Sequence, residues 1–286
     1  MRVAIVTCLN IPEPDVDELF MVEALRAAGA TPSVVAWDDA GVDWASFDVA
    51  VVRSTWNYYL YQEPFRAWIG HVAERTRLLN PAGVLLGNMD KWYLSELKSA
   101  GVPVIPTAWV GRGEGADLAS IASDRGWLDV GVVVKPSVSA GSWRTRRFEP
   151  GDLESGQAFL EELSSERGVM VQRFMPSVAQ GGERAIVCVG GAVTHAVEKT
   201  PRFDGEEERV SGALDVSAEE KAFVARVLDA AVGEAAPEVA YARVDVIRDD
   251  DGSVRLSELE LLEPSLFLKQ SRAALTRFAE TVVAAG

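Results

Sequence analysis

Three carboxylates in the C-terminal part of the sequence are spaced so that they could bind a cation together. Glu258 and Glu260 alternate with leucines in the run 256–261, and residues i and i+2 of a β-strand point to the same face. Asp245 would lie opposite them if the preceding run pairs antiparallel. Carboxylates this close repel unless a cation lies between them, and oxygen ligands suit Mg²⁺, above all when it carries phosphate. An ordinary solvated strand face is the alternative, and Asp245 favours the metal site.

The second feature that could do chemistry is Lys135, which ends an apolar run and precedes a loop of small residues. The run 130–135 is apolar enough to form an internal strand, and the loop 136–142 is rich in hydroxyl and backbone N–H groups. A lysine beside such a loop is suited to hold a phosphate group. The alternative is a strand-end lysine that reaches solvent. The sequence has no GxxxxGK[ST] motif, which excludes a P-loop protein.

The elements that position these residues begin with an alternation of strands and helices in the N-terminal part of the chain. Apolar runs at 2–7, 33–37 and 48–52 predict three strands, and 63–75 predicts a helix. Another helix, ending near Gly29, is indicated by apolar residues at helical spacing. These are Val16, Leu19, Phe20, Ala24, Ala27 and Ala28. The order predicts a small doubly wound parallel sheet, in which ligands gather at the carboxyl ends of the strands.

No GxGxxG follows the first strand, so a nicotinamide site is not indicated. We therefore expect the strand ends to contact the substrate. The candidates are Thr7, Ser54, Thr55 and Trp56. The loop 201–212 is a further region that could select the substrate.

From residue 88 onward the pattern changes to an α+β arrangement. Ser217 and Glu220 form a capping box at the start of the longest expected helix. The segment 249–252 predicts a hairpin turn, and the alternative of a calcium loop lacks the required ligand spacing. Helices are expected over 90–100, 152–165, 217–235 and the C-terminal segment, and strands over 130–135, 143–148, 169–174, 184–189, 192–199, 239–248 and 253–262.

Composition excludes several classes of protein. The 286 residues include 43 acidic against 28 basic side chains, a net charge of −15, which argues against nucleic acid or an anionic membrane as the partner. Two distant cysteines indicate neither a disulfide framework nor a zinc ribbon, and no run is long and apolar enough for a transmembrane helix. We therefore expect a cytoplasmic protein with a small-molecule substrate. The sequence leaves a homo-oligomer possible.

Taken in order, several short motifs resemble those of the ATP-grasp ligases, in the glutathione-synthetase-like branch. Each motif is weak alone, whereas their order and spacing over residues 88–264 are specific. Within that branch the whole chain is most similar to the cyclo-ligases that form D-cycloserine. The motifs are Asn88–Lys91, Gly101–Pro103, Pro106-Thr107, Val133–Pro136, Val171–Pro176, Gly182-Glu183, Arg243–Asp245 and Glu258–Glu260.

The resemblance implies an ATP-grasp fold, of mixed α/β and α+β class, preceded by a small doubly wound α/β domain. The implied domains are 1–87, 88–171 with the lid, and 172–286 with the metal site. ATP and Mg²⁺ are the implied cofactors, with Mn²⁺ as a possible substitute. The implied metal ligands are Asp245, Glu258 and Glu260, of which Glu260 replaces the asparagine of many relatives.

The resemblance also assigns ATP and catalytic contacts, residue by residue. Lys91 and Lys135 match the two lysines that hold the phosphates, and 172–175 matches the segment that contacts adenine. Lys199, Arg209 and Arg243 match basic residues near the reacting phosphate. The complete set of implied ATP contacts is Lys91, Lys135, Ser137, Ser139, Gly141, Ser142, Gln172, Arg173, Phe174, Met175, Glu183 and Arg184.

The implied reaction activates a carboxylate as an acyl phosphate for attack by nitrogen. In the cyclo-ligase reading the nitrogen belongs to the same molecule, and O-ureido-D-serine closes to D-cycloserine with release of ADP, phosphate, CO₂ and ammonia. One alternative is an intermolecular carboxylate–amine ligase with a dipeptide-like product. The other is a non-catalytic module that senses ATP.

Overall fold

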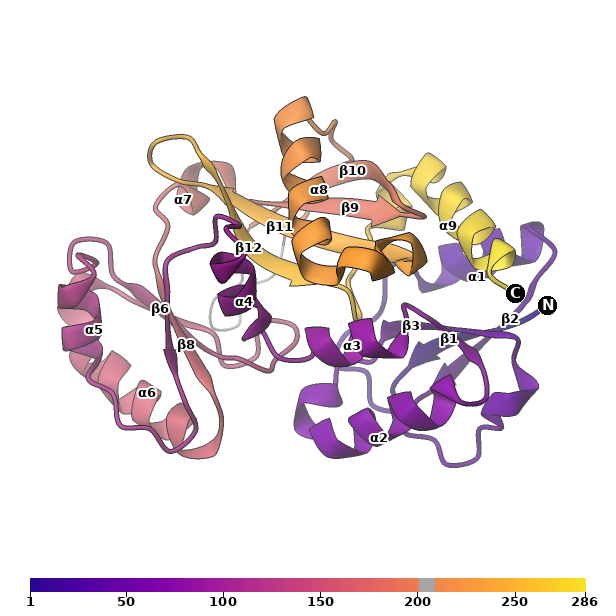
Figure 1. The fold of residues 1–286 in the computed structure, drawn as a ribbon, viewed down its shortest axis with the longest axis horizontal. Coiled ribbons are helices and arrows are strands. Elements are labelled where there is room, and N and C mark those ends of the chain that lie inside the picture. The colour runs from indigo at the N-terminus through magenta and orange to yellow at the C-terminus, as the bar shows by residue number, and fades with distance from the viewer. Residues whose placement is uncertain (201–208) are drawn as a thin grey trace.

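The computed structural model describes residues 1–200 and 209–286, which are built around three four-stranded sheets (Figure 1). The N-terminal sheet is parallel, with strand order β2-β1-β3-β4. Helices α1 and α9 pack on one face of it, and α2 and α3 on the other, so the predicted doubly wound arrangement is confirmed. Its elements are β1 (Arg2–Thr7), α1 (Glu18–Ala27), β2 (Thr31–Ala36), β3 (Val49–Ser54), α2 (Gln62–Ala73), β4 (Arg77–Leu79) and α3 (Ala82–Asn88).

The apolar face of α1 differs from the one that the helical spacing predicted. Met21 and Leu25 are fully buried against the sheet, whereas Leu19 is 72% exposed. Val16 and Phe20 are exposed as well. The reason is that α1 packs between the sheet and α9 along its Met21–Leu25 side, so the positions that form the alternative apolar stripe face outward.

The middle sheet is antiparallel, with strand order β5-β8-β6-β7. Helices α5 and α6 cover one face of it and bury Leu118, Phe159 and Leu163 against the strands. Its elements are β5 (Thr107–Val110), α5 (Leu118–Asp124), β6 (Val132–Pro136), β7 (Arg146–Phe148), α6 (Leu153–Glu166) and β8 (Val169–Arg173).

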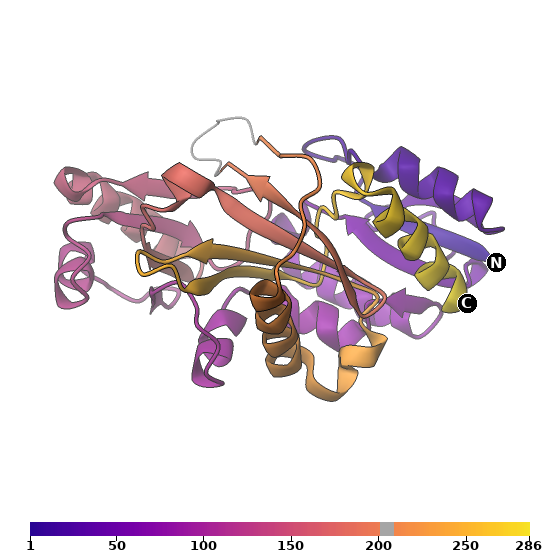
Figure 2. The same ribbon diagram turned by 90° about the horizontal axis from the view of Figure 1, so that it is seen from above.

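The C-terminal sheet has strand order β10-β9-β11-β12 and is also antiparallel. Helix α8 lies across one face, beside α4, and its predicted capping box of Ser217 and Glu220 is present (Figure 2). The tight turn 249–252 joins β11 to β12, with Gly252 at φ +82°. The elements are α4 (Tyr93–Ser99), α7 (Val178–Gly181), β9 (Glu183–Val189), β10 (Ala192–Lys199), α8 (Ala218–Val232), β11 (Tyr241–Arg248), β12 (Val254–Glu260) and α9 (Arg272–Ala284).

Short 3₁₀ segments complete the described chain. The sequence patterns predicted neither the short strand β4 nor the helices α3 and α5. The 3₁₀ segments are Trp44–Ser46, Tyr58–Leu60, Pro150–Asp152, Gly233–Glu238 and Leu268–Gln270. No helix in the described ranges is both long and apolar enough to cross a membrane. The expected domain boundaries at 87/88 and 171/172 fall inside α3 and β8, so we propose the three sheets themselves as the units.

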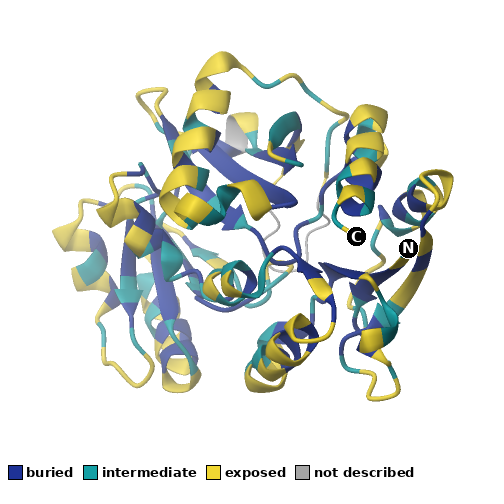
Figure 3. Ribbon diagram, turned by 45° about the vertical axis from the view of Figure 1, so that its right-hand side comes forward, coloured by how far each residue is buried: buried dark blue, intermediate teal, exposed yellow. Residues whose placement is uncertain are grey.

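Buried polar contacts fix the N-terminal sheet to the C-terminal one. The Asn80 side chain donates to Tyr241 O at 2.9 Å and to Leu261 O at 2.7 Å. The hydroxyl of Tyr241 in turn donates to Val52 O or Leu79 O, at 2.7 and 2.8 Å. Most strand residues are buried, whereas the outer faces of the helices are exposed (Figure 3). The carboxyl edge of the parallel sheet therefore has a fixed position relative to β11 and β12.

Candidate active site

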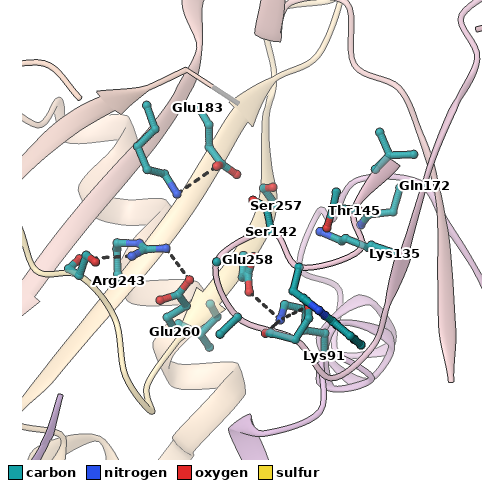
Figure 4. A pocket seen from close by; sticks show the side chains of 18 of the residues that line it. Lys91, Lys135, Ser142, Thr145, Gln172, Glu183, Arg243, Ser257, Glu258 and Glu260 are labelled. Atoms are coloured by element: carbon teal, nitrogen blue, oxygen red, sulfur yellow. Dashed lines mark hydrogen bonds and ion pairs between the residues drawn. The ribbon is translucent and has the colours of Figure 1, made fainter. Parts of the chain in front are cut away.

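A cavity of about 410 Å³ lies where the three sheets meet. Its walls come from β6 and β8 of the middle sheet, from β9, β11 and β12 of the C-terminal sheet, and from the loop 139–143 (Figure 4). Trp56, Tyr58 and Tyr59, which follow β3, line it as well. The carboxyl edge of a parallel sheet thus contributes to the cavity, as is general for such sheets.

Strands β11 and β12 carry a row of charged side chains to the cavity. Their register pairs Asp245 with Glu258 and Arg243 with Glu260, so these four side chains share one face. The residues that alternate with them are buried in the core on the other face. The predicted antiparallel pairing, with Asp245 opposite the glutamates, is confirmed.

The two glutamates of this row have cationic partners. Lys91 Nζ lies 3.1 Å from Glu258 Oε1, and the guanidinium of Arg243 donates to Glu260 (Figure 4). Burial alone would raise the pKa of Glu258, but the charges of Lys91 and Lys135 lower it. Burial raises the pKa of Glu260 to about 7, against the effect of Arg243. An anionic ligand that binds together with a cation could replace these ion pairs. Its negative charge would then pair with Lys91 and Arg243, and its cation with Glu258 and Glu260.

Asp245 belongs to this row, but it is fully buried and does not line the cavity. Lys199 Nζ donates to its Oδ2 at 2.6 Å, and Arg243 donates to both oxygens at 2.8 and 2.9 Å. Lys199 also lies 3.1 Å from Glu183. Burial alone would raise the pKa of Asp245, but Arg243 and Lys199 lower it. In this arrangement Asp245 orients two cations that line the cavity.

The implied Mg²⁺ can be tested against this donor set. Within residues 1–200 and 209–286, no three His, Cys, Asp or Glu side chains are grouped so that they could hold a metal ion. Glu258 and Glu260 fit Mg²⁺ as a pair, because both line the cavity from one strand face. Asp245 is bonded to Arg243 and Lys199 instead. The cavity thus offers two carboxylates, which suits a Mg²⁺ that keeps phosphate oxygens among its ligands.

The two lysines expected to hold phosphates approach the cavity from different elements. Lys91 follows α3, and its Nζ donates to Ser139 O at 2.6 Å as well as meeting Glu258. Lys135 lies on β6 and lines the cavity, and its ammonium has no hydrogen bond or ion pair with any residue that the structure describes. Burial, together with the charge of Lys91, lowers the pKa of Lys135. An unpaired ammonium in a cavity wall is a strong anion-binding group.

At one side the cavity has an apolar slot beside the segment 172–175. Its side chains pack as one buried cluster, consisting of Ile105, Met175, Val178 and Ile247. The backbone N–H groups of Arg173 and Phe174 already donate to Pro106 and Gly131, at 2.9 and 3.1 Å. A flat, apolar ring fits such a slot.

Many of the residues singled out in the sequence line this one cavity. They are Trp56, Lys91, Lys135, Ser139, Gly141, Ser142, Gln172, Arg173, Phe174, Met175, Glu183, Lys199, Arg243, Glu258 and Glu260.

Other candidate contacts lie outside the cavity wall. Thr7 and Ser54 bond to each other, with Ser54 Oγ 3.0 Å from Thr7 Oγ1, and Thr55 is fully buried. Ser137 is buried too, and its carbonyl accepts the Lys91 N–H at 2.8 Å. These residues shape the elements that carry the cavity wall instead of facing its interior.

Two basic candidates are placed elsewhere. Arg184 is next to Glu183 on β9 and therefore points to the opposite face of the sheet, where its Nε donates to Glu220 Oε1 at 2.6 Å. Arg209 is exposed and is absent from the cavity wall. Residues 201–208 of the candidate loop 201–212 lie outside the described part of the chain.

Several wall residues were not found by sequence reasoning. Tyr58, Tyr93 and Trp143 carry no motif, and only the folded chain brings them together. Glu263 also lines the cavity and is 8% exposed. Its position three residues after Glu260 is the one feature of the sequence that could have indicated it. Burial, followed by the charge of Glu260, raises the pKa of Glu263 to about 8.

Comparison with known proteins decides the family. A profile described as the N-terminal domain of D-cycloserine synthetase DcsG matches residues 3–80. The cycloserine biosynthesis protein DcsG of Streptomyces lavendulae is 31% identical over 287 residues, which cover 94% of this chain and 93% of that protein. The chain belongs to the D-cycloserine synthetase family.

Solved structures agree with membership of the D-cycloserine synthetase family. The crystal structure of D-cycloserine synthetase DcsG matches with a TM-score of 0.89 and 30% identity over 99% of both chains. The ATP-grasp ligase PsnB, in complex with a minimal precursor, Mg and ADP, has a TM-score of 0.64 at 19% identity, over 99% of this chain and 97% of that one. The expected ATP-grasp fold is confirmed, and the chain is an ATP-dependent ligase.

Proposed function

We propose that this protein is an ATP- and Mg²⁺-dependent cyclo-ligase that converts O-ureido-D-serine to D-cycloserine. The observation that carries the proposal is the full-length similarity to D-cycloserine synthetase DcsG. The cavity supports it, because one wall offers a carboxylate pair while the others offer lysines and an apolar slot. One turnover consumes ATP and water and releases ADP, phosphate, CO₂ and ammonia.

ATP would lie along the cavity, with its adenine in the apolar slot and its phosphates between Lys91 and Lys135. Glu258 and Glu260 would hold Mg²⁺, which neutralises phosphate charge when bound. Lys91 would exchange its ion pair with Glu258 for a contact to phosphate, and Glu258 would then be available to hold the metal. Such charge neutralisation and positioning are what phosphoryl transfer requires, so the reaction needs no protein nucleophile.

The substrate carboxylate then attacks the γ-phosphorus, and ADP leaves, which gives an acyl phosphate. Arg243 and Lys199 line this part of the cavity, and Asp245 holds both in place. Their charges stabilise the additional negative charge of the transition state. The loop 139–143 would exclude water, which otherwise hydrolyses the acyl phosphate.

Ring closure follows within the same molecule. The ureido nitrogen that is bonded to oxygen attacks the acyl carbon, a C–N bond forms, and phosphate leaves with one former carboxylate oxygen. The product is a five-membered ring, whose carbamoyl group is lost with water as CO₂ and ammonia. Intramolecular attack avoids the entropy cost of collecting a second substrate, an advantage that reaches about 7 kcal/mol in well-oriented systems.

The test is a measurement of ADP release with O-ureido-D-serine, other small amino acids and their ureido derivatives, each with and without an added amine. The proposal predicts Mg²⁺-dependent ADP release with O-ureido-D-serine alone and a product of the mass of D-cycloserine. A requirement for an added amine would instead indicate an intermolecular ligase. ATP binding without ADP release from any carboxylate would indicate a sensor.

A further inference from the structure

The segment that follows β12 is held in place on both sides of Glu263. Trp56 Nε1 donates to the backbone carbonyl of Glu263 at 3.0 Å, and Arg243 Nη1 donates to that of Ser265 at 3.3 Å. All four residues line the cavity. Because its backbone is fixed by neighbours from two other elements, the side chain of Glu263 starts from a defined position in the cavity wall.

The carboxylate of Glu263 has no hydrogen bond or ion pair with any residue in the described ranges, although the residue is only 8% exposed. The nearby cations are committed elsewhere, Lys91 to Glu258 and Arg243 to Asp245. Ionisation of a buried carboxyl group without a partner is costly, in line with the raised pKa of Glu263, and a cation from outside the chain would remove that cost. Glu263 therefore differs from the other acids of the cavity, which already have partners.

Binding of ATP and Mg²⁺ does not supply this cation in the proposed arrangement. In that arrangement Lys91 and Lys135 would contact the phosphates, and Glu258 and Glu260 would hold the metal. Glu263 would stay unpaired next to Trp56 in the wall of the cavity that ATP and the amino acid must share. Of the groups on O-ureido-D-serine, the carboxylate reacts and the ureido group is neutral, so its only cation is the α-ammonium group.

We propose that Glu263 binds the α-ammonium group of the substrate and thereby selects α-amino acids over the corresponding deamino acids. The inference rests on the proposed function, because it requires an amino acid in the cavity. Trp56, which bonds to the backbone of Glu263, and Tyr58 also line the cavity, and aromatic side chains stabilise an ammonium group next to a carboxylate. Glu263 is then a specificity-determining residue, separate from the pair that serves the metal.

The test compares O-ureido-D-serine with 3-(ureidooxy)propanoate, the same molecule without its amino group, in the wild type and in Glu263→Gln. Wild type should favour the amino substrate by about 100-fold or more in kcat/KM. Glu263→Gln should lower kcat/KM for the amino substrate by roughly 10- to 100-fold through KM, and leave the deamino analogue and the KM for ATP nearly unchanged. Glu263→Asp keeps the charge and should retain most of the discrimination.

Glu220→Gln is the matched control, since Glu220 is a buried glutamate outside the cavity and should leave the discrimination unchanged. Equal losses for both substrates in Glu263→Gln would overturn the inference, because Glu263 would then act on the reacting groups or on the fold. Unchanged discrimination would overturn it too. If wild type releases ADP with no amino acid, the proposed function fails and takes this inference with it.

Discussion

The two faces of strand β9 carry charged clusters that differ in whether their charges are satisfied within the chain. On one face, Arg184 Nε donates to Glu220 Oε1 at 2.6 Å, and its Nη2 to Asp215 O at 3.0 Å, in a shallow hollow beside α8. On the other face is the cavity, where Lys135 and Glu263 have no partner among the described residues. The ion pair of Arg184 with Glu220 holds the sheet to α8, whereas the unpaired side chains of Lys135 and Glu263 can bind charged groups of a ligand.

The difference between the two faces of β9 explains why two adjacent residues, Glu183 and Arg184, have different roles. Glu183 and Arg184 are adjacent on β9, so their side chains point to opposite faces. Glu183 meets Lys199 in the cavity wall, and Arg184 meets Glu220 in the hollow. Substitutions on the two faces should therefore act on different measurements, catalysis on one and stability on the other.

The largest expected effect is on the cavity face. Glu260→Ala removes one of the two carboxylates that would hold Mg²⁺ and leaves Arg243 without that partner. We expect Mg²⁺-dependent ATP binding to weaken and kcat/KM for ADP release to fall by at least about 100-fold. Isothermal titration with Mg-ATP and steady-state kinetics measure the two effects. Unchanged ATP turnover would remove Glu260 from the metal site.

A smaller effect is expected from Lys135→Met, which removes the unpaired ammonium and keeps the length of the side chain. The KM for ATP should rise by roughly 10- to 100-fold, because a charge-assisted contact to phosphate is lost. Lys135→Arg should restore part of the affinity. If Lys135→Met leaves the KM for ATP unchanged, Lys135 is a strand-end lysine without a phosphate role.

Substitutions in the hollow beside α8 should change the stability of the fold and leave catalysis unchanged. Glu220→Gln removes the charge that pairs with Arg184 and weakens the cap of α8, so the free energy of unfolding should fall by about 1–3 kcal/mol. The KM for ATP should stay within about twofold of wild type, as for substitutions away from a site. Urea denaturation and steady-state kinetics give the two numbers. A large loss of ATP affinity at full stability would contradict the division between the faces.

The stability effect of Glu220 should also depend on pH. Burial alone would raise its pKa, but the hydrogen bonds from Ser217 and the contact with Arg184 lower it below the ordinary value of 4.5. A lowered pKa means that the carboxylate stabilises the fold above the unfolded-state pKa and loses this contribution as the pH falls below it. The stability difference between wild type and Glu220→Gln should therefore shrink below pH 4.5. A constant difference would indicate that the charge of Glu220 contributes nothing.

The smallest expected effect is that of Ser217→Ala, which removes the side-chain oxygen that accepts the Glu220 N–H at 3.2 Å. Loss of this N-cap should cost about 1 kcal/mol of stability and leave catalysis unchanged. Thermal unfolding measures the loss of stability, and the rate of ADP release measures catalysis. A change in KM for ATP would show that α8 is coupled to the cavity.

Local patterns in the sequence were sufficient for the strands that carry the site. The alternation of Glu258 and Glu260 and the Asp-Gly turn predicted the pairing with Asp245, because strand period and turn chemistry are local properties. The family resemblance supplied the ATP contacts, including Lys91, which no local pattern singles out.

The patterns failed where packing between distant elements decides the outcome. The apolar stripe of α1 was misassigned because α9 covers its Met21–Leu25 side. The bonding of Asp245 to Lys199 and Arg243 could not be read from spacing, since Lys199 comes from another strand. Glu263 faces the cavity only because Trp56 and Arg243 fix the segment after β12.

In the proposed reaction, ATP activates a substrate carboxylate as an acyl phosphate, and nitrogen from the same molecule then displaces the phosphate. The most direct measurement uses O-ureido-D-serine labelled with ¹⁸O at both carboxylate oxygens, with ATP and Mg²⁺ but no added amine. Intramolecular attack on an acyl phosphate predicts phosphate that carries one ¹⁸O and D-cycloserine that retains the other. Unlabelled phosphate, or labelled phosphate that appears only with an added amine, would contradict it.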